Sequence, residues 1–250
     1  MEANSELFSR LEDLIERSDR DGTVTHTLFL TPKEQYQAEN WLRGRRFQRF
    51  ITGSGVDNTE RNVILFYPEW MEKDEVSFDG YVSGVSIKVG FGEPGHRDYL
   101  GSIMGLGIKR EWIGDILING SEGYVICLNS VQETLVSELT HIARFGVKTS
   151  PVTVSDIPSK KLEVREKSFT VMSLRLDSIT ASAFNISRGK AAQFIEEGFV
   201  SLNYDECLKP STEIKEKDII SVRGLGKGIV REIKGLSRKG RTIVDFSLYT

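Results

Sequence analysis

The chain has 250 residues, of which 39% are hydrophobic, and a formal net charge of −3. This length allows one large domain or two to three small ones, and the composition is ordinary for a globular protein. No run approaches the roughly 18 apolar residues of a membrane-spanning helix, and the charged start lacks the apolar core of a signal peptide. We therefore expect a cytoplasmic protein without a membrane segment.

Cysteine and histidine usage argues against a metal centre. Cys127 and Cys207 are far apart and form no C-x-x-C pair, and the three histidines are scattered. This pattern fits a reducing compartment and excludes a disulfide framework or a thiolate zinc site. The sequence predicts neither a bound metal nor a cofactor.

Residues 1–78 are predicted to form a small α/β region. Leucines at helical spacing indicate an amphipathic helix over residues 5–18. Thr31-Pro32-Lys33-Glu34 has the pattern of a capping box, with proline at the first helical position, and opens a helix that runs to about Arg43. Two strands, over residues 47–52 and 62–67, follow on either side of a glycine-rich turn.

Residues 79–155 are predicted to form a ferredoxin-like, RRM-like domain. The expected order β-α-β-β-α-β covers residues 82–89, 99–104, 115–119, 124–128, 130–144 and 145–154. Ser130 and Glu133 have the spacing of a second capping box, at the start of the second helix. Many RNA-binding domains share this plan, and so do many proteins that never touch RNA, so the fold alone does not give the function.

Residues 156–172 are predicted to be a linker. They contain Pro158, alternating charges and little apolar periodicity, which favours semi-independent movement of the flanking domains. Residues 173–250 would then form a third domain. The predicted fold class is thus α+β, in a chain of several domains.

The third domain is predicted to open with two short helices. The first begins at Arg175-Leu176-Asp177, and the second is capped by Ser187 and ends at Gly198. Arg188 and Lys190 fall in the first turn of the second helix, where free N–H groups and the helix dipole favour a phosphate. Chance placement of charge on an exposed helix is the alternative.

Charge is unevenly distributed along the chain. From Arg175 onward there are 13 basic and 10 acidic residues, a charge of +3 that leaves −6 for the remainder. Between Val222 and Val244 there are seven basic residues and one acid, Glu232. A local basic stripe on an acidic protein indicates an RNA-binding module, although a solvated lysine-rich surface has the same composition.

The spacing of motifs over residues 174–245 favours an RNA-binding module over a solvated lysine-rich surface. The runs R-L-D, S-R-x-K-A-x-x-x-I-x-x-G-x-V-x-L-N, K-P and I-x-x-x-D-x-I-x-V-R-G resemble the RNA-binding domain first seen in small-subunit ribosomal protein S-four, the alpha-L motif. Lys217 departs from the glycine usual in that family. The resemblance implies that Asp177 holds the two helices together. The expected RNA-binding residues are Arg175, Ser187, Arg188, Lys190, Gln193, Lys209, Arg223, Lys227 and Arg231.

Residues 95–111 and the run Ile113-Gly114-Asp115-Ile116 resemble the signature of the bacterial YlmH-type proteins, as does the order of domains. This resemblance implies a non-catalytic, monomeric protein that binds ribosomal RNA and tRNA on the large ribosomal subunit and helps to rescue stalled subunits carrying peptidyl-tRNA. A relative in photosynthetic bacteria has a similar layout, so the cellular role is open. Within the signature, three glycines are expected to make a tight helix–sheet contact, and three cations to form a possible second RNA surface. They are Gly101, Gly105 and Gly107, and Arg97, Lys109 and Arg110.

Other functional classes fit parts of the sequence. The run from Arg175 to Thr180 matches the R-L-D-x-x-T around the catalytic aspartate of pseudouridine synthases, although that residue belongs to a large mixed-sheet domain for which the chain has no room. His96-Arg97-Asp98 lacks a nucleophile or a metal.

The run from Gly90 to Gly95 fits a dinucleotide fingerprint, but Pro94 and the hairpin downstream contradict the helix and the parallel unit that it needs. A protein-binding adaptor remains an alternative.

Overall fold

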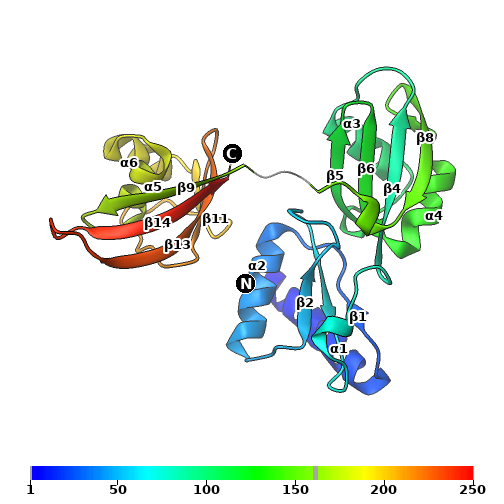
Figure 1. The fold of residues 1–250 in the computed structure, drawn as a ribbon, viewed down its shortest axis with the longest axis horizontal. Coiled ribbons are helices and arrows are strands. Elements are labelled where there is room, and N and C mark those ends of the chain that lie inside the picture. The colour runs from blue at the N-terminus through cyan, green and yellow to red at the C-terminus, as the bar shows by residue number, and fades with distance from the viewer. Residues whose placement is uncertain (1, 160–162, 250) are drawn as a thin grey trace. The chain divides into compact units, whose positions relative to one another are not determined.

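The computed structural model describes residues 2–159 and 163–249, which belong to two compact units, residues 1–160 and 161–250 (Figure 1). Both units combine helices with antiparallel sheets, so the predicted α+β class with several domains is confirmed. Within the described residues, no helix has the length and apolar character to cross a membrane.

The N-terminal region of the first unit packs two helices on a three-stranded sheet. Helices α1 (Glu2–Asp21) and α2 (Pro32–Gly44) bury Leu11, Ala38 and Leu42 against β3 (Val63–Phe66). The predicted capping box is present, since Glu34 accepts from the Thr31 backbone at 2.7 Å and Thr31 accepts from that of Glu34 at 3.3 Å. The strand order is β1-β3-β2, with β1 at Thr25–His26 and β2 at Phe50–Gly53. Strand β1 was not predicted because two residues carry no periodic signal.

The rest of the first unit is an antiparallel sheet of order β5-β6-β4-β8-β7 with two helices on one face. The expected β-α-β-β-α-β sequence of elements is present. Its members are β4 (Val82–Val89), α3 (His96–Gly105), β5 (Ile113–Asn119), β6 (Glu122–Leu128), α4 (Asn129–Glu138) and β8 (Phe145–Val152).

Helix α4 is shorter than predicted. The predicted helix over residues 130–144 is wrong at its end, because Leu139 leaves the helical conformation at ψ 83° and β7 (His141–Ile142) turns back onto β8. Ile142 is buried in this hairpin, which pulls the chain into the sheet. The predicted cap is also wrong, since the helix starts at Asn129 and no side chain caps it.

The two parts of the first unit share a core. Phe29, Val63 and Leu65 of the N-terminal region pack against Val82 and Ile126 on the sheet face opposite α3 and α4. The Phe29 backbone also donates to the carbonyl of Glu111 at 2.8 Å. The expected boundary at residue 78 therefore falls inside one compact unit. This part of the sheet face is closed to the base stacking that RRM-like sheets use for RNA.

The second unit is a six-stranded antiparallel sheet of order β11-β10-β12-β13-β14-β9 with two helices (Figure 1). Its helices are α5 (Leu176–Phe184) and α6 (Arg188–Glu196). Its strands are β9 (Val164–Val171), β10 (Val200–Leu202), β11 (Asp205–Glu206), β12 (Ile219–Val222), β13 (Gly226–Leu236) and β14 (Thr242–Tyr249). The core joins Leu176, Ile179 and Ile195 of the helices to Val230 and Phe246 of the sheet.

Strand β9 corrects the predicted linker. Residues 164–171 pair along their whole length with β14, so most of the expected linker over residues 156–172 belongs to the second unit. This strand was not predicted because a charged residue, Lys167, occupies one of its inward positions. The Lys167 amine donates a hydrogen bond to the Ala183 carbonyl at the end of α5, at 2.6 Å. A cation is well placed there, since the last carbonyls of a helix lack partners. Residues 160–162, also assigned to the linker, lie outside the described residues.

Candidate nucleic-acid interface

Helix α6 begins at the predicted cap. The Ser187 hydroxyl accepts a hydrogen bond from the backbone of Lys190 at 3.2 Å, which satisfies one of the free N–H groups of the first turn. Arg188 and Lys190 are both exposed on this turn, as predicted. The cap sets the direction of the helix and therefore the side on which the two cations lie. Ser187 itself has a structural role here.

Asp177 links the starts of the two helices. Its carboxylate is 6% exposed and accepts hydrogen bonds from Arg175 at 2.9 and 3.1 Å and from Arg188 at 3.2 to 3.3 Å. Burial acts to raise the pKa of this carboxyl, but the hydrogen bonds from the two arginines outweigh it and hold the pKa below its ordinary value. The expected role of Asp177 is confirmed. Because the two arginines share one acid, this cluster offers RNA a single net positive charge.

A row of two cations and two aromatic rings lies beside this cluster in the same unit, and we call it the cation–aromatic row. Lys190 Nζ lies 5.3 Å from the centre of the Phe194 ring. Phe194 meets Phe199 edge to face, with ring centres 5.7 Å apart. The guanidinium carbon of Arg223 lies 5.1 Å from the centre of the Phe199 ring. Both cations are exposed and both rings are half-buried, so the row presents charge and aromatic surface together.

The backbone holds the row in place. The Phe199 N–H donates to the Phe194 carbonyl at 2.8 Å, and the Arg223 N–H donates to the Phe199 carbonyl at 2.9 Å. Pairing of Val200 with Val222, between β10 and β12, brings these residues together from distant parts of the sequence. The row therefore rests on a helix end and on a sheet, which keeps its side chains from drifting apart.

The remaining predicted RNA-binding residues are not part of the cation–aromatic row. The Lys227 amine lies 6.0 Å from the ring centre of Tyr204. Gln193 is exposed, but its amide donates to Glu197 at 2.8 Å. Lys209 and Arg231 are exposed, and among the described residues no contact joins either to the row.

The aromatic half of the row was not predicted from the sequence. Lys190 and Phe194 stand four residues apart on a helix, a spacing that predicts contact between their side chains. The neighbourhood of Phe199 and Arg223 was not visible, because it depends on the register of β10 and β12. Aromatic side chains among cations are the expected signal of a surface that binds single-stranded or splayed RNA.

The possible second surface in the first unit is only partly available. Arg97 and Lys109 are exposed. Arg110 is half-buried and donates to the backbone carbonyls of Ile113 and Gly114. Burial and the nearby Arg61 lower the pKa of Arg110 to about 10. The expectation that Arg110 faces RNA is therefore corrected, because its donors are used inside the protein.

The glycines beside these cations are also unlike the prediction. A Cβ built on Gly101, Gly105 or Gly107 would meet no atom of the described chain within 4 Å. The expected tight helix–sheet contact is thus wrong at these positions. It exists instead at Gly123, where a Cβ would lie 2.6 Å from the Tyr99 ring of α3. The close approach comes from the sheet side, and α3 itself needs no glycine for it.

The two aspartates that suggested catalysis have structural partners. Asp98 accepts from the Gly95 backbone at 2.8 Å and so caps α3. The pseudouridine-synthase aspartate corresponds to Asp177, which two arginines hold. Helix α3 does begin directly after Gly95, against expectation, but β4 pairs antiparallel with both neighbours, which excludes a parallel dinucleotide-binding unit. Across the described residues, no cluster of three His, Cys, Asp or Glu could hold a metal.

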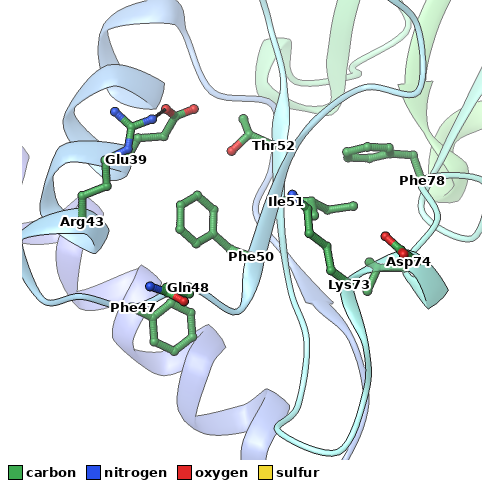
Figure 2. A pocket seen from close by; sticks show the side chains of 11 residues that line it. Glu39, Arg43, Phe47, Gln48, Phe50, Ile51, Thr52, Lys73, Asp74 and Phe78 are labelled. Atoms are coloured by element: carbon green, nitrogen blue, oxygen red, sulfur yellow. Dashed lines mark hydrogen bonds and ion pairs between the residues drawn. The ribbon is translucent and has the colours of Figure 1, made fainter.

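A groove in the N-terminal region runs beside the edge strand β2. Figure 2 shows Phe50 and Thr52 pointing towards α2. The groove is lined by two acids, Glu39 and Asp74, and two bases, Arg43 and Lys73, so its charges balance. Arg43 pairs with Glu39 at 2.8 Å. Without an excess of positive charge, this groove offers no electrostatic attraction to a phosphate backbone.

Comparisons with known proteins agree with this architecture. Residues 75–156 match the family model described as "Putative RNA-binding domain in YlmH", and residues 174–220 match the S4 domain. The chain is 30% identical over 222 residues to the ribosome-associated protein quality control protein P2 of Bacillus subtilis, an alignment covering 88% of this chain and 85% of that protein. It is also similar to the solved structure of cell division protein YlmH from Streptococcus pneumoniae, with 20% identity, a TM-score of 0.46, and coverage of 62% of this chain and 90% of that one.

An RRM-like domain followed by an S4 domain, whose capped helix carries cations beside aromatic rings, defines a modular RNA-binding protein. Identity over most of both chains then gives the particular family. The protein belongs to the YlmH family and carries a C-terminal S4 domain.

Proposed function

We propose that this protein binds ribosomal RNA and tRNA on the large ribosomal subunit through its second unit, and that it acts without catalysis in the quality control of stalled subunits bearing peptidyl-tRNA. It would do so in the cytoplasm, as a monomer. The observation that carries the proposal is the cation–aromatic row, in which Lys190 and Arg223 stand over Phe194 and Phe199.

The chemistry of the row suits RNA. Exposed cations neutralise phosphates and release counterions, which supplies affinity without sequence preference. Aromatic faces stack on unpaired bases and on riboses, which are available in the loops and ends of RNA. The single net charge of the Asp177 cluster lies on the same unit and adds to the attraction. A ribosomal partner is supported by the Bacillus subtilis relative, whose name describes a ribosome-associated quality control protein.

The absence of catalysis is supported by the use of Asp177. A catalytic aspartate must be free to reach its substrate, whereas this carboxylate is buried and accepts from Arg175 and Arg188. It also lies on a helix of the S4 domain, which leaves no separate catalytic domain around it. Mapping modified bases after incubation of the protein with ribosomal RNA tests this part, and new pseudouridines would replace the proposal with an enzymatic function.

Sedimentation with purified ribosomal subunits tests the binding. The protein should travel with the large subunit and be released as salt rises, because counterion release makes phosphate binding depend on salt. A variant with both Lys190 and Arg223 replaced by Glu should remain in the supernatant. Association with the small subunit alone, or none at low salt, would overturn the proposal.

A further inference from the structure

Strand β13 extends past its neighbour β12 in the second unit. Strand β12 pairs only with residues 226–229 of β13, while β14 pairs with β13 as far as Leu236. The far half of the β13–β14 hairpin stays in the sheet, because β9 pairs with β14 as far as Thr242, and only residues 237–241, which close the hairpin, extend beyond the paired strands (Figure 1). We call these five residues the hairpin tip. They lie beyond residues 174–220, which match the S4 domain.

The hairpin tip is an ordered turn. The Ser237 N–H donates to the Arg241 carbonyl at 2.7 Å, and the Gly240 N–H donates to the Ser237 carbonyl at 2.9 Å. The Ser237 hydroxyl accepts from the Arg241 backbone at 3.1 Å. All three bonds leave the side chains of the basic residues out of the turn. The tip thus presents Arg238, Lys239 and Arg241 from a fixed backbone.

These three cations have no acid beside them. Arg238, Lys239 and Arg241 are exposed, and none has an ion-pair partner among residues 163–249 as described. Lys234, further down the hairpin, is different because Asp245 and Glu232 both pair with it. From Arg231 to Arg241 there are five cations and one acid, a net charge of +4. The concentration of unpaired charge at the tip would attract a polyanion strongly.

The tip and Arg223 of the cation–aromatic row lie near opposite ends of β13. Arg223 and Lys227 flank its beginning, and the tip follows its last residue, Leu236. At a strand rise of about 3.3 Å per residue, the two ends are roughly 30 Å apart.

We infer that the hairpin tip is a second phosphate-binding site, so that the second unit holds one folded RNA at two points roughly 30 Å apart, with unpaired nucleotides at the row and the backbone of the adjoining stem at the tip. The inference rests on the proposed function, since it assumes that the row binds RNA. The partner at the tip is the phosphate backbone of a stem long enough to reach it from the row. A short RNA bound at the row leaves the tip unoccupied.

The test compares two RNA stem-loops and two variants of the full chain. One stem-loop has about five base pairs and the other about sixteen, the span over which a double-stranded RNA-binding domain makes its contacts. The tip variant carries Arg238→Gln, Lys239→Gln and Arg241→Gln. The control variant carries Lys148→Gln, Arg165→Gln and Lys215→Gln, which removes the same charge from exposed positions outside both sites.

With the long stem-loop, the tip variant should show a salt slope of binding lower by about 3, one for each lost phosphate contact. With the short stem-loop, it should bind as the wild type does, which also shows that it is folded. The control variant should match the wild type on both RNAs. Equal binding of the long RNA by the wild type and the tip variant would overturn the inference alone, as would equal losses on both RNAs. No binding of either RNA by the wild type would overturn the proposed function and the inference with it.

Discussion

Arginine and lysine side chains serve two different purposes in the two units. In the first unit, Arg61 and Arg110 point inward and donate to the carbonyls of Phe29, Ile113 and Gly114, where the N-terminal region meets the sheet. Burial lowers the pKa of both. In the second unit, Lys190 and Arg223 lie over aromatic rings and remain exposed.

This difference shows why a count of cations does not locate a binding surface. Arg110 belongs to the segment that resembles the YlmH signature, yet its donors are satisfied by backbone oxygens. A hydrogen-bonded guanidinium inside a protein must lose those bonds before it can bind a phosphate. Whether a cation can bind RNA depends on its hydrogen-bond and ion-pair partners in the fold, and the sequence alone does not reveal them. Substitution of the half-buried Arg110 should therefore lower stability and leave RNA affinity unchanged. Substitution of the exposed cations of the row should lower RNA affinity and leave stability unchanged.

The largest effect is expected from Lys190→Glu combined with Arg223→Glu. Two phosphate contacts are lost and replaced by repulsion, so RNA affinity should fall roughly hundredfold, and the salt slope by about 2. Melting temperature should change little because both side chains are exposed. Arg165→Glu combined with Lys215→Glu makes the same charge change outside the row and serves as the control. An equal loss of affinity in the control would show that only net charge matters.

Arg110→Ala should lower the stability of the first unit and leave RNA affinity unchanged. Removing its guanidinium leaves the Gly114 carbonyl without this donor inside the first unit, at a cost of about 2 to 3 kcal/mol of stability. All three tryptophans, Trp41, Trp70 and Trp112, lie in the first unit, so denaturant unfolding followed by tryptophan fluorescence reports on that unit alone.

Lys109→Ala is the matched control, an exposed neighbour whose loss should change stability by less than about 0.5 kcal/mol. Affinity of the folded Arg110→Ala variant for RNA should equal that of the wild type. Unchanged stability together with weaker RNA binding would instead assign Arg110 to an RNA surface.

Asp177→Asn should weaken the second unit by about 1 to 2 kcal/mol at neutral pH, because Asn keeps one acceptor but loses the charge that holds two arginines. The lowered pKa of Asp177 stabilises the fold above the ordinary value of about 3.9, and this contribution is lost as pH falls through the lowered pKa. The wild type should therefore lose its advantage over the variant on acidification. Hydrogen exchange at the amides of α5, measured across this range, tests it.

The smallest effect is expected at Gly101, which lies within α3 with open space around the position of a Cβ. Gly101→Ala should stabilise the first unit by about 0.5 to 1 kcal/mol, since alanine is the better helix former. Gly123→Ala, where a Cβ would collide with Tyr99, should destabilise it. If Gly101→Ala raises stability but weakens subunit binding, a partner of the protein approaches α3 at this glycine.

Local signals gave most of the elements in advance. The capping box at Thr31 and the cap at Ser187 both form, whereas the capping box expected at Ser130 does not, because the helix there already starts at Asn129. The link through Asp177 was also anticipated, from the resemblance to the alpha-L motif. The larger failures involve long-range partners. Strand β9 resembled a linker until β14 was placed beside it, and the charged Arg110 resembled a surface residue until its carbonyl acceptors were known.

The candidate site divides in the same way. Exposure of Arg188 and Lys190 followed from their place in a helical turn, whereas the meeting of Phe199 with Arg223 required the pairing of two strands. The ion pairs of Arg175 and Arg188 with Asp177 show that a correct position does not establish a free charge.

Strands β9 and β14 bring the two ends of the second unit, as described, next to each other. Val164 pairs with Tyr249, so the chain enters and leaves the unit on neighbouring strands, about 5 Å apart. A module with adjacent ends can be spliced into a surface loop of another protein without stretching either. The same geometry sets its response to mechanical force. Tension applied at residues 164 and 249 would load the hydrogen bonds of this ladder one after another, opening the unit like a zipper at low force.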